Sequence, residues 1–343
     1  MASRNGMGWA WLLALASVLA WTGCARRNPS SPAAESRPPL RIHEASNGVV
    51  ALQVVVRDLL PRRRSDPVVR LVGVTHLGSA EYYQRLQSLL DREPLVLFEG
   101  VGARDKKFMS TRESSYSLQP ALAKALGLKF QLSAIDYSHD RFVNSDLSVE
   151  QLAAIARRQG TAGGQQDDGG PGEDLGVGDL MAVMDGSSWA GLLVRFGVAF
   201  IETSPKLRAT VRLVLIETLG AVESDPSQAK GLPPEMRRLM EVLIQERNGA
   251  VVADLRRLID RGRASARARV PSVAVFYGAG HLPDLEQRVQ RELGYRPGRE
   301  EWLTAFDVHP ARDGMGPADV AVARGMVREQ LRMLGMGKKR PKP

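Results

Sequence analysis

Residues 68–100 constrain the fold of this chain more than any other stretch. Residues 68–72 form a short apolar run rich in β-branched side chains, which ends at Gly73, and His76 follows just beyond it. A run of this kind is typical of a strand buried on both faces. The sequence therefore predicts a buried strand with a histidine just past its carboxyl end.

A helix and a second strand follow at once. Ser79 is a favourable N-cap, and residues 80–90 place apolar side chains at helical spacing, so a helix is expected to begin near Ser79. Residues 95–98 are apolar again, so a second strand is expected there, with Glu99 directly after it. Ligands of open α/β sheets bind outside the carboxyl ends of the strands, so we expect His76 and Glu99 on one rim.

The same order recurs late in the chain. A strand is expected over residues 270–277, a Gly-x-x-His turn over residues 278–281, a helix over residues 282–293 and a closing strand over residues 303–308. Such a pseudo-repeat would bring His76 and His281 together. Thr304 stands where Glu99 stands in the first half, so only that half supplies a carboxylate. Two ordinary βα turns are the alternative interpretation.

These patterns predict an α/β fold with a mixed or mostly parallel sheet flanked by helices, in two pseudo-repeated βα halves within residues 48–310. Residues 49–56 are expected to form a strand paired with residues 68–72. A helix over residues 117–126 and a strand over residues 130–135 should follow Glu99.

A long insertion separates the two halves. Residues 159–178 are rich in Gly and Asp and predict a mobile loop, and residues 180–260 predict a helical insertion that could cap the site. Arg195 interrupts the most apolar part of that insertion, which argues against a membrane span. Residues 311–343 are expected to form a C-terminal helix and a basic tail.

The amino-terminal segment predicts export. Residues 1–23 resemble a signal peptide, and Cys24, the one cysteine of the chain, follows Trp21-Thr22-Gly23 as in a bacterial lipoprotein signal. Trp21 replaces the Leu-type residue usual in that signal. Residues 24–47 would be a lipid-anchored flexible tether, which makes the chain a cell-envelope lipoprotein, and Ala25 is compatible with the outer membrane. A soluble exported protein with a leftover cysteine is the alternative.

Composition excludes several classes of function. With one cysteine, the chain has no internal disulfide, no cysteine nucleophile besides the proposed anchor and no Cys-ligated zinc site. The net charge is +9, but aromatic residues are only 6% and do not alternate with the basic ones, so we expect no nucleic-acid partner. Adjacent Ser138, His139 and Asp140 cannot form a hydrolytic triad, because its members converge from separate segments; His139 is kept as an additional site candidate.

Four motifs in order resemble one protein family. They are Gly73-Val74-Thr75-His76, Phe98-Glu99-Gly100, Glu246-Arg247-Asn248 and Gly278-Ala279-Gly280-His281-Leu282. Together they resemble the TraB/PrgY/GumN family, which includes the Tiki metalloproteases and belongs to a wider group with the erythromycin esterases and the ChaN-like haem-binding lipoproteins. The resemblance covers about residues 49–308.

The resemblance implies a divalent-metal peptidase acting on a peptide or small acyl substrate. His76, Glu99 and His281 would bind the metal, which could be manganese, cobalt or zinc, and mixed nitrogen and oxygen ligands suit all three. Arg247 would orient Glu99 or stabilise an oxyanion.

Three other functions remain open. His76 and Glu99 could activate water without a metal, as in an esterase. A ChaN-like protein would instead bind haem through His281, His76 or Tyr277. A lipoprotein that only sequesters peptides or pheromones is the last alternative.

Overall fold

The computed structural model describes residues 37–100, 118–148, 151, 154–155, 201, 203–221 and 234–333. The expected signal peptide, Cys24, the loop over residues 159–178 and the basic tail lie outside the described residues. The strands are β1 (Leu40–Glu44), β2 (Val50–Leu60), β3 (Val68–Val74), β4 (Leu77–Gly78), β5 (Val96–Phe98), β6 (Lys129–Phe130), β7 (Phe142–Asn144), β8 (Ser272–Gly278) and β9 (Arg296–Val308). The α-helices are α2 (Ala80–Leu90), α4 (Leu118–Ala125), α5 (Gln131–Ala134), α9 (Pro205–Ala221), α10 (Pro234–Ala264), α11 (Leu282–Leu293) and α12 (Pro317–Met333), with 3-10 turns at Ala266–Ala268 and Ala279–His281.

One mixed sheet organises the molecule, as expected. Strands β3, β8, β5 and β7 are adjacent in that order and parallel. Strand β2 runs antiparallel to β3, with Val56 opposite Val72, and it also pairs antiparallel with β1 and β9. The α/β class is therefore confirmed, and so is the pairing of the strand after residue 49 with β3. The expected neighbours β3 and β8 lie side by side with Gly73 opposite Tyr277.

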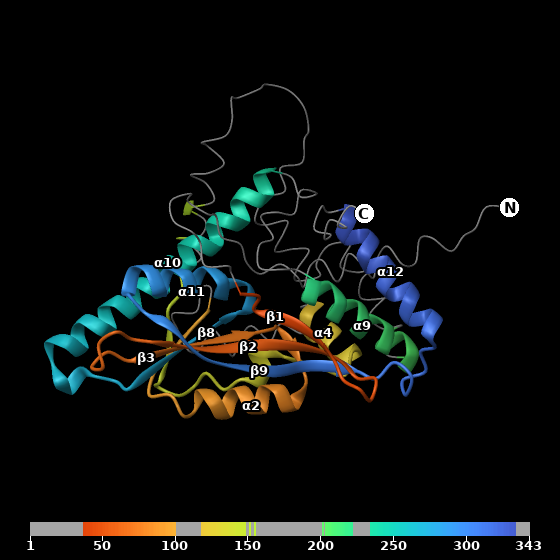
Figure 1. Ribbon diagram of the computed structural model, residues 1–343, viewed down its shortest axis with the longest axis horizontal. Coiled ribbons are helices and arrows are strands. Elements are labelled where there is room, and N and C mark those ends of the chain that lie inside the picture. The colour runs from red at the N-terminus through yellow and green to blue at the C-terminus, as the bar shows by residue number, and fades with distance from the viewer. Residues whose placement is uncertain are drawn as a thin grey trace, which may run out of the picture.

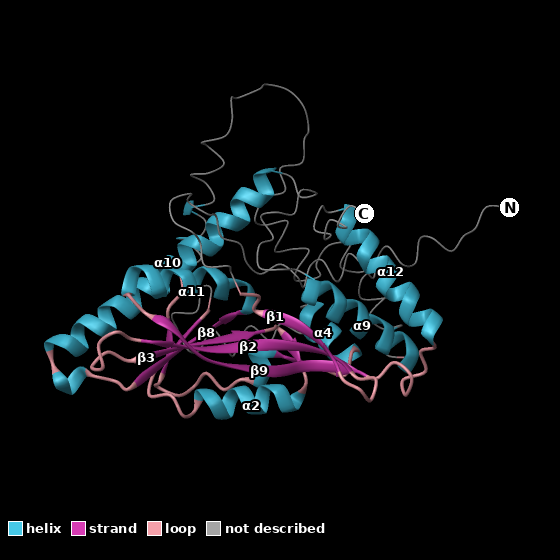
Figure 2. Cartoon of the chain, in the orientation of Figure 1, coloured by secondary structure: helices cyan, strands magenta, loops and turns pink. Residues whose placement is uncertain are grey.

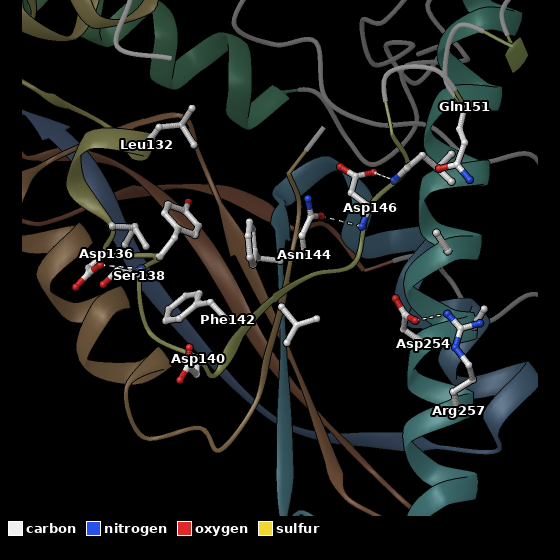
Figure 3. Close-up of a pocket in the computed structure, with 17 residues that line it drawn as sticks. Leu132, Asp136, Ser138, Asp140, Phe142, Asn144, Asp146, Gln151, Asp254 and Arg257 are labelled. Atoms are coloured by element: carbon white, nitrogen blue, oxygen red, sulfur yellow. Dashed lines mark hydrogen bonds and ion pairs between the residues drawn. The ribbon is translucent and has the colours of Figure 1, made fainter. Parts of the chain in front are cut away.

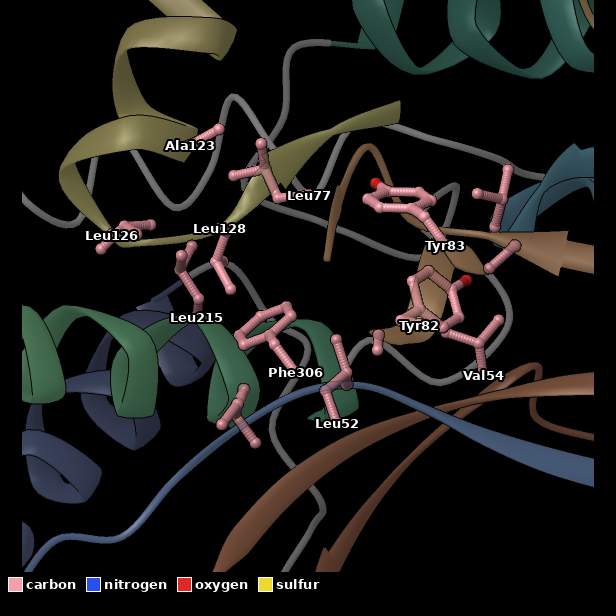
Figure 4. Packing of buried hydrophobic residues seen from close by; sticks show 14 of the residues in the cluster. Leu52, Val54, Leu77, Tyr82, Tyr83, Ala123, Leu126, Leu128, Leu215 and Phe306 are labelled. Atoms are coloured by element: carbon pink, nitrogen blue, oxygen red, sulfur yellow. The ribbon is translucent and has the colours of Figure 1, made fainter. Parts of the chain in front are cut away.

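Different helices bury the two faces of the sheet, and Figures 1 and 2 show α10 and α11 on one side of the strands and α2 on the other. Alternate residues of the central strands point to opposite faces, as the pleat requires: Leu71 and Val275 pack on the side of α10 and α11, whereas Val72 and Phe276 pack on the opposite side, with α2, α4, α9 and α12. Figure 4 shows part of this second cluster, in which Tyr82 and Leu215 meet Leu52 and Phe306 of the sheet. Both faces are covered, as is usual for parallel strands.

Helix α2 forms as its sequence predicts. The side chain of Ser79 accepts a hydrogen bond from the backbone N–H of Tyr82 at 3.1 Å, which caps the first turn. Tyr82, Tyr83, Leu86 and Leu90 form the buried face. The helix returns the chain to the start of β5, so that β3 and β5 end on the same rim.

The predicted strand over residues 130–135 is wrong. Only Lys129 and Phe130 are extended, paired with β4, and residues 131–134 form the short helix α5. The backbone N–H of Gln131 donates to the carbonyl of His76, and that of Ile135 donates to the carbonyl of Gln131, which closes a helical turn. Strand β7, which was not predicted, lies next to β5 at the end of the sheet, on the side away from β8.

The tether prediction also needs correction, because part of residues 24–47 is a strand. Residues 40–44 form β1, which pairs antiparallel with β2. Leu40 and Ile42 are partly buried against the core, and this packing explains why the segment is ordered. Strand β9 pairs antiparallel with β2, whereas β5 pairs parallel with β8, so the two closing strands have different neighbours and the pseudo-repeat stays a prediction.

The helical insertion is described in part. Helix α9 and the long helix α10 fall within residues 180–260, as expected, and α10 continues unbroken to Ala264. One stripe of α10 is buried against the sheet; it consists of Val251, Val252, Leu255, Leu258 and Ile259. None of the helices in the described ranges is both long and apolar enough to span a bilayer.

Candidate functional site

The carboxyl ends of four parallel strands carry the polar side chains of interest. Strand β3 is followed by His76, β5 by Glu99, β7 by Asp146, and β8 by the turn that ends at His281. Because the four strands are parallel and adjacent, these residues belong to one rim of the sheet. The predicted convergence of two Gly-x-x-His turns on one rim is thus present in the backbone.

Glu99 is the centre of the contacts at this rim. Its Oε1 accepts a hydrogen bond from Arg247 Nη2 at 2.5 Å, and its Oε2 accepts one from the backbone N–H of Gly278 at 2.7 Å. The side chain of Glu99 is only 15% exposed. Arg247 therefore contacts Glu99 directly, and its two expected roles, orienting Glu99 or stabilising an oxyanion, stay predictions.

Asp146, which was not predicted from the sequence, completes the ion cluster. Arg247 Nε donates to Asp146 Oδ1 at 2.9 Å and Nη2 donates to Oδ2 at 2.7 Å, a two-pronged contact that fixes the plane of the guanidinium. The Asp146 side chain is fully buried and also accepts hydrogen bonds from the backbone N–H groups of Gly100 and Leu147. Among the described residues, Nη1 of Arg247 has no partner, so this nitrogen can donate to a ligand.

The charges of the cluster are strongly coupled. Burial would raise the pKa of Glu99, but Arg247, His281, the Gly278 amide and His76 together hold it well below its usual range. Burial would lower the pKa of Arg247, but Glu99 and Asp146 raise it above its usual value. Glu99 is consequently a carboxylate and Arg247 a guanidinium at any physiological pH.

His281 is buried and held by an amide side chain. Its Nδ1 lies 2.7 Å from Asn248 Oδ1, while Asn248 Nδ2 donates to Asp284 Oδ2 at 2.9 Å. The amide oxygen can only accept, so Nδ1 of His281 carries the hydrogen. Burial lowers the pKa of His281 to about 4, against the opposing influence of Glu99. Neutral His281 therefore has its lone pair on Nε2.

That lone pair faces a carboxylate oxygen. Nε2 of His281 lies 3.6 Å from Glu99 Oε1, and neither atom has a hydrogen to give the other when His281 is neutral. Two ligands at about 2.1 Å from one tetrahedral ion lie roughly 3.4 Å apart, so the spacing and the nitrogen–oxygen donor pair fit a divalent cation.

The third proposed ligand is oriented in the same way as His281. Nδ1 of His76 lies 3.1 Å from Gln131 Oε1, and Gln131 Nε2 donates to the hydroxyl of Tyr137 at 3.0 Å. Nδ1 therefore carries the hydrogen here too, and Nε2 of His76 has no partner in the described part of the chain. Within that part, no three His, Cys, Asp or Glu side chains are gathered as a metal-binding group, so the structure does not bring His76, Glu99 and His281 together as one set of ligands.

The other candidates have different surroundings. Tyr277 is fully buried, its hydroxyl donates to the carbonyl of Ser145 at 2.6 Å, and its ring meets that of His281 edge to face. His139 is half exposed on a loop, 3.5 Å from Asp136. Thr304 accepts a hydrogen bond from Gln53 on the sheet.

The site residues that directly follow long apolar runs were predictable from the sequence, but the residues that hydrogen-bond to them were not. Asp146 follows a strand of three residues, and Gln131 was assigned to the wrong element. Asn248 belongs to one of the four motifs, but its contact with His281 depends on how α10 packs against the Gly-x-x-His turn. An Asn-x-Asp pattern directly after an apolar pair was the available signal for Asp146.

Comparisons with family models, curated proteins and solved structures gave no match to this chain.

Proposed function

We propose that this chain is a membrane-tethered, divalent-metal-dependent hydrolase that acts on extracytoplasmic peptides. The resemblance of its four motifs to the TraB/PrgY/GumN family suggests this activity. The observation that carries the proposal is the pair of acceptors, His281 Nε2 and Glu99 Oε1, that face each other at 3.6 Å. Glu99 Oε1 already accepts a hydrogen bond from Arg247 Nη2, and a cation between the two atoms would bind this oxygen together with the lone pair of His281 Nε2.

His281 and Glu99 would hold the ion, and His76, which is not gathered with them in this structure, would have to move in from the adjacent strand end to complete the ligand set. A divalent ion in such a site lowers the pKa of bound water and polarises an acyl oxygen. Asn248 and Gln131 would keep the two histidines in the tautomer that ligates through Nε2, as second-layer partners of metal ligands commonly do. Manganese, cobalt and zinc all suit this donor set.

Arg247 has two functions in this proposal. Its Nη2 donates to both Glu99 and Asp146, and its Nε donates to Asp146, so the guanidinium is held rigidly. Its Nη1 is then positioned to donate a hydrogen bond to negative charge that develops on an acyl oxygen. A donor that is already oriented costs no reorganisation during the reaction.

The test is metal analysis of protein purified without chelators, followed by titration of the chelator-treated protein with manganese, cobalt and zinc. We expect about one ion per chain and peptide hydrolysis that chelation removes and the ion restores. His281→Ala and Glu99→Gln should lose metal and activity together. His139→Ala is the matched control, because His139 lies on an exposed loop, and it should keep both.

Three outcomes would each contradict the proposal. Activity that persists after exhaustive chelation would indicate a metal-independent esterase. A Soret absorption band without hydrolysis would indicate haem binding, although Tyr277 as an axial ligand would first have to give up its hydrogen bond to Ser145. Tight peptide binding without turnover or metal would indicate a sequestering protein. Circular dichroism of each variant separates loss of the site from loss of the fold.

A further inference from the structure

A large cavity lies beside the edge strand β7, next to the ion cluster. Its volume is about 930 Å³, within the range of small-molecule and peptide sites. In Figure 3, Asp254 and Arg257 of α10 stand on one wall, Asp136 and Phe142 stand on the other, and Asn144 and Asp146 lie between them at one end. Phe98, which directly precedes Glu99, also lines it. The cavity thus begins at residues that hold the candidate site.

One stripe of helix α10 connects the site with the cavity. Arg247, Ala250, Asp254 and Arg257 follow one another at intervals of three or four positions, which places them on one face of the helix. Ala253, three positions after Ala250 and four before Arg257, belongs to the same stripe. Arg247 contacts Glu99, and the other four line the cavity. At 1.5 Å per residue the stripe is about 15 Å long, the length of roughly four residues of extended peptide.

The small residues of this stripe keep the cavity open. Ala250 and Ala253 occupy positions where larger side chains would reach across toward β7, and the neighbouring Val251, Val252 and Leu255 turn away into the core. The wall opposite α10 is aromatic. Phe98, Tyr137 and Phe142 pack with ring centroids 5.0–6.2 Å apart, and because at most 8% of each residue is exposed, an apolar ligand group reaches only a small part of each ring.

The polar groups of the wall favour an uncharged or basic ligand over an acidic one. Four aspartates line the cavity: Asp136, Asp140, Asp146 and Asp254. Among the described lining residues Arg257 is the one cation; it pairs with Asp254, and Asp146 pairs with Arg247. Asp254 also accepts a hydrogen bond from Ser145 Oγ. An acidic side chain placed here would meet the like charges of Asp136 and Asp140.

We propose that this cavity binds the substrate on one side of the scissile bond, with a bulky, uncharged apolar side chain against Phe98, Tyr137 and Phe142. The substrate class is then a peptide with an aromatic or branched aliphatic residue close to the cleaved bond. This inference rests on the proposed peptidase function. Tyr137 also connects the cavity with His76. Its hydroxyl accepts a hydrogen bond from Gln131, and the side-chain oxygen of Gln131 contacts Nδ1 of His76.

The test measures binding separately from turnover. Capped tripeptides Ac-Gly-X-Gly-NH₂, with X as Phe, Leu, Ala or Asp, are titrated into the full chain and followed by calorimetry. We expect Phe and Leu to bind at least roughly ten times more tightly than Ala, and Asp to bind weakest; one buried apolar side chain suffices for this ratio. Ala253→Trp should fill the cavity and abolish the preference, whereas Arg256→Trp, on the exposed side of the same helix, should retain it.

The possible outcomes separate the proposed binding cavity from the proposed hydrolase activity. Equal binding of all four peptides, or a preference that survives in Ala253→Trp, overturns the cavity assignment. Metal binding with turnover but without any side-chain preference refutes the cavity and leaves the hydrolase standing. A clear preference without metal or turnover supports the cavity and refutes the hydrolase. If Ala253→Trp fails to fold, the titrations of the wild-type chain still test the side-chain preference. Ala250→Leu then takes the place of Ala253→Trp as a smaller obstruction of the cavity.

Discussion

At the scale of single residues, Asn248 determines which nitrogen of His281 is free. Its amide oxygen accepts from Nδ1, and its nitrogen donates to Asp284 and to the carbonyl of His281. In Asn248→Ala the imidazole would lose this partner and could exchange tautomers or rotate. We expect metal affinity to fall by roughly 10- to 100-fold. Isothermal titration with zinc and manganese measures this, and an unchanged dissociation constant in a folded variant would contradict the assigned role.

Asp66 provides a residue-scale prediction about pH that is independent of the site. Its carboxylate accepts two hydrogen bonds from Arg263, at 3.1 and 2.7 Å, and this contact lowers its pKa below the usual 3.8. A depressed carboxyl pKa stabilises the folded state above about pH 4, and the contribution is lost as the pH falls through the folded value. Asp66→Asn should therefore cost about 1 kcal/mol at pH 7 and progressively less below pH 4. Urea unfolding of both proteins across this range is the measurement, and a cost that is independent of pH would count against the ion pair.

At the scale of elements, Gly73 shows why the first motif needs glycine. A Cβ atom there would lie 2.9 Å from Val54 Cγ1, 3.0 Å from the carbonyl oxygen of Val55 and 3.1 Å from Leu282 Cδ2. Strand β3 and the start of α11 therefore approach each other closely at this point. Gly73→Ala should destabilise the fold by about 1–3 kcal/mol.

Gly249 offers the matched control within helix α10. A Cβ atom at this position would meet nothing within 4 Å, so alanine adds no clash. Because glycine weakens a helix interior, Gly249→Ala should stabilise the protein by about 0.5–1 kcal/mol. Thermal unfolding should thus shift in opposite directions for the two glycines, and a loss of stability in both would contradict the steric account.

Elements were predictable where local signals and tertiary contacts agree. Helix α2 has its cap, its apolar face and its flanking strands in one continuous stretch, and it forms where expected. Residues 130–135 alternate in the manner of a strand, but Gln131 bonds through both its backbone and its side chain to His76, far away in the sequence, and a helical turn results. Strand β7 has only three residues and acquires its place by pairing with β5. Asp146 was missed for the same reason.

At the scale of the whole molecule, contacts with Arg57 attach Arg37 and Pro38 to the sheet. Arg57 is buried within β2, and its guanidinium donates to Glu286, to Glu300 and to the carbonyls of Arg37 and Pro38. Arg37 itself pairs with the same two glutamates. A chain leading from Cys24 to Arg37 could extend at most about 45 Å. Acylation of Cys24 would therefore hold the sheet and its rim close to a membrane surface.

This gives the last prediction, which concerns location. In a bacterial envelope, the wild-type chain should partition into the detergent phase, because an acylated cysteine adds about 0.8 kcal/mol of membrane affinity per buried methylene. Cys24→Ala should release the chain as a soluble or uncleaved form, while Ser31→Ala, in the same segment, should leave partitioning unchanged. Labelling with a radioactive fatty acid identifies the modification directly. Unaltered membrane partitioning of Cys24→Ala would defeat the lipoprotein assignment, and the candidate site would be unaffected, because its described residues all lie beyond Arg37.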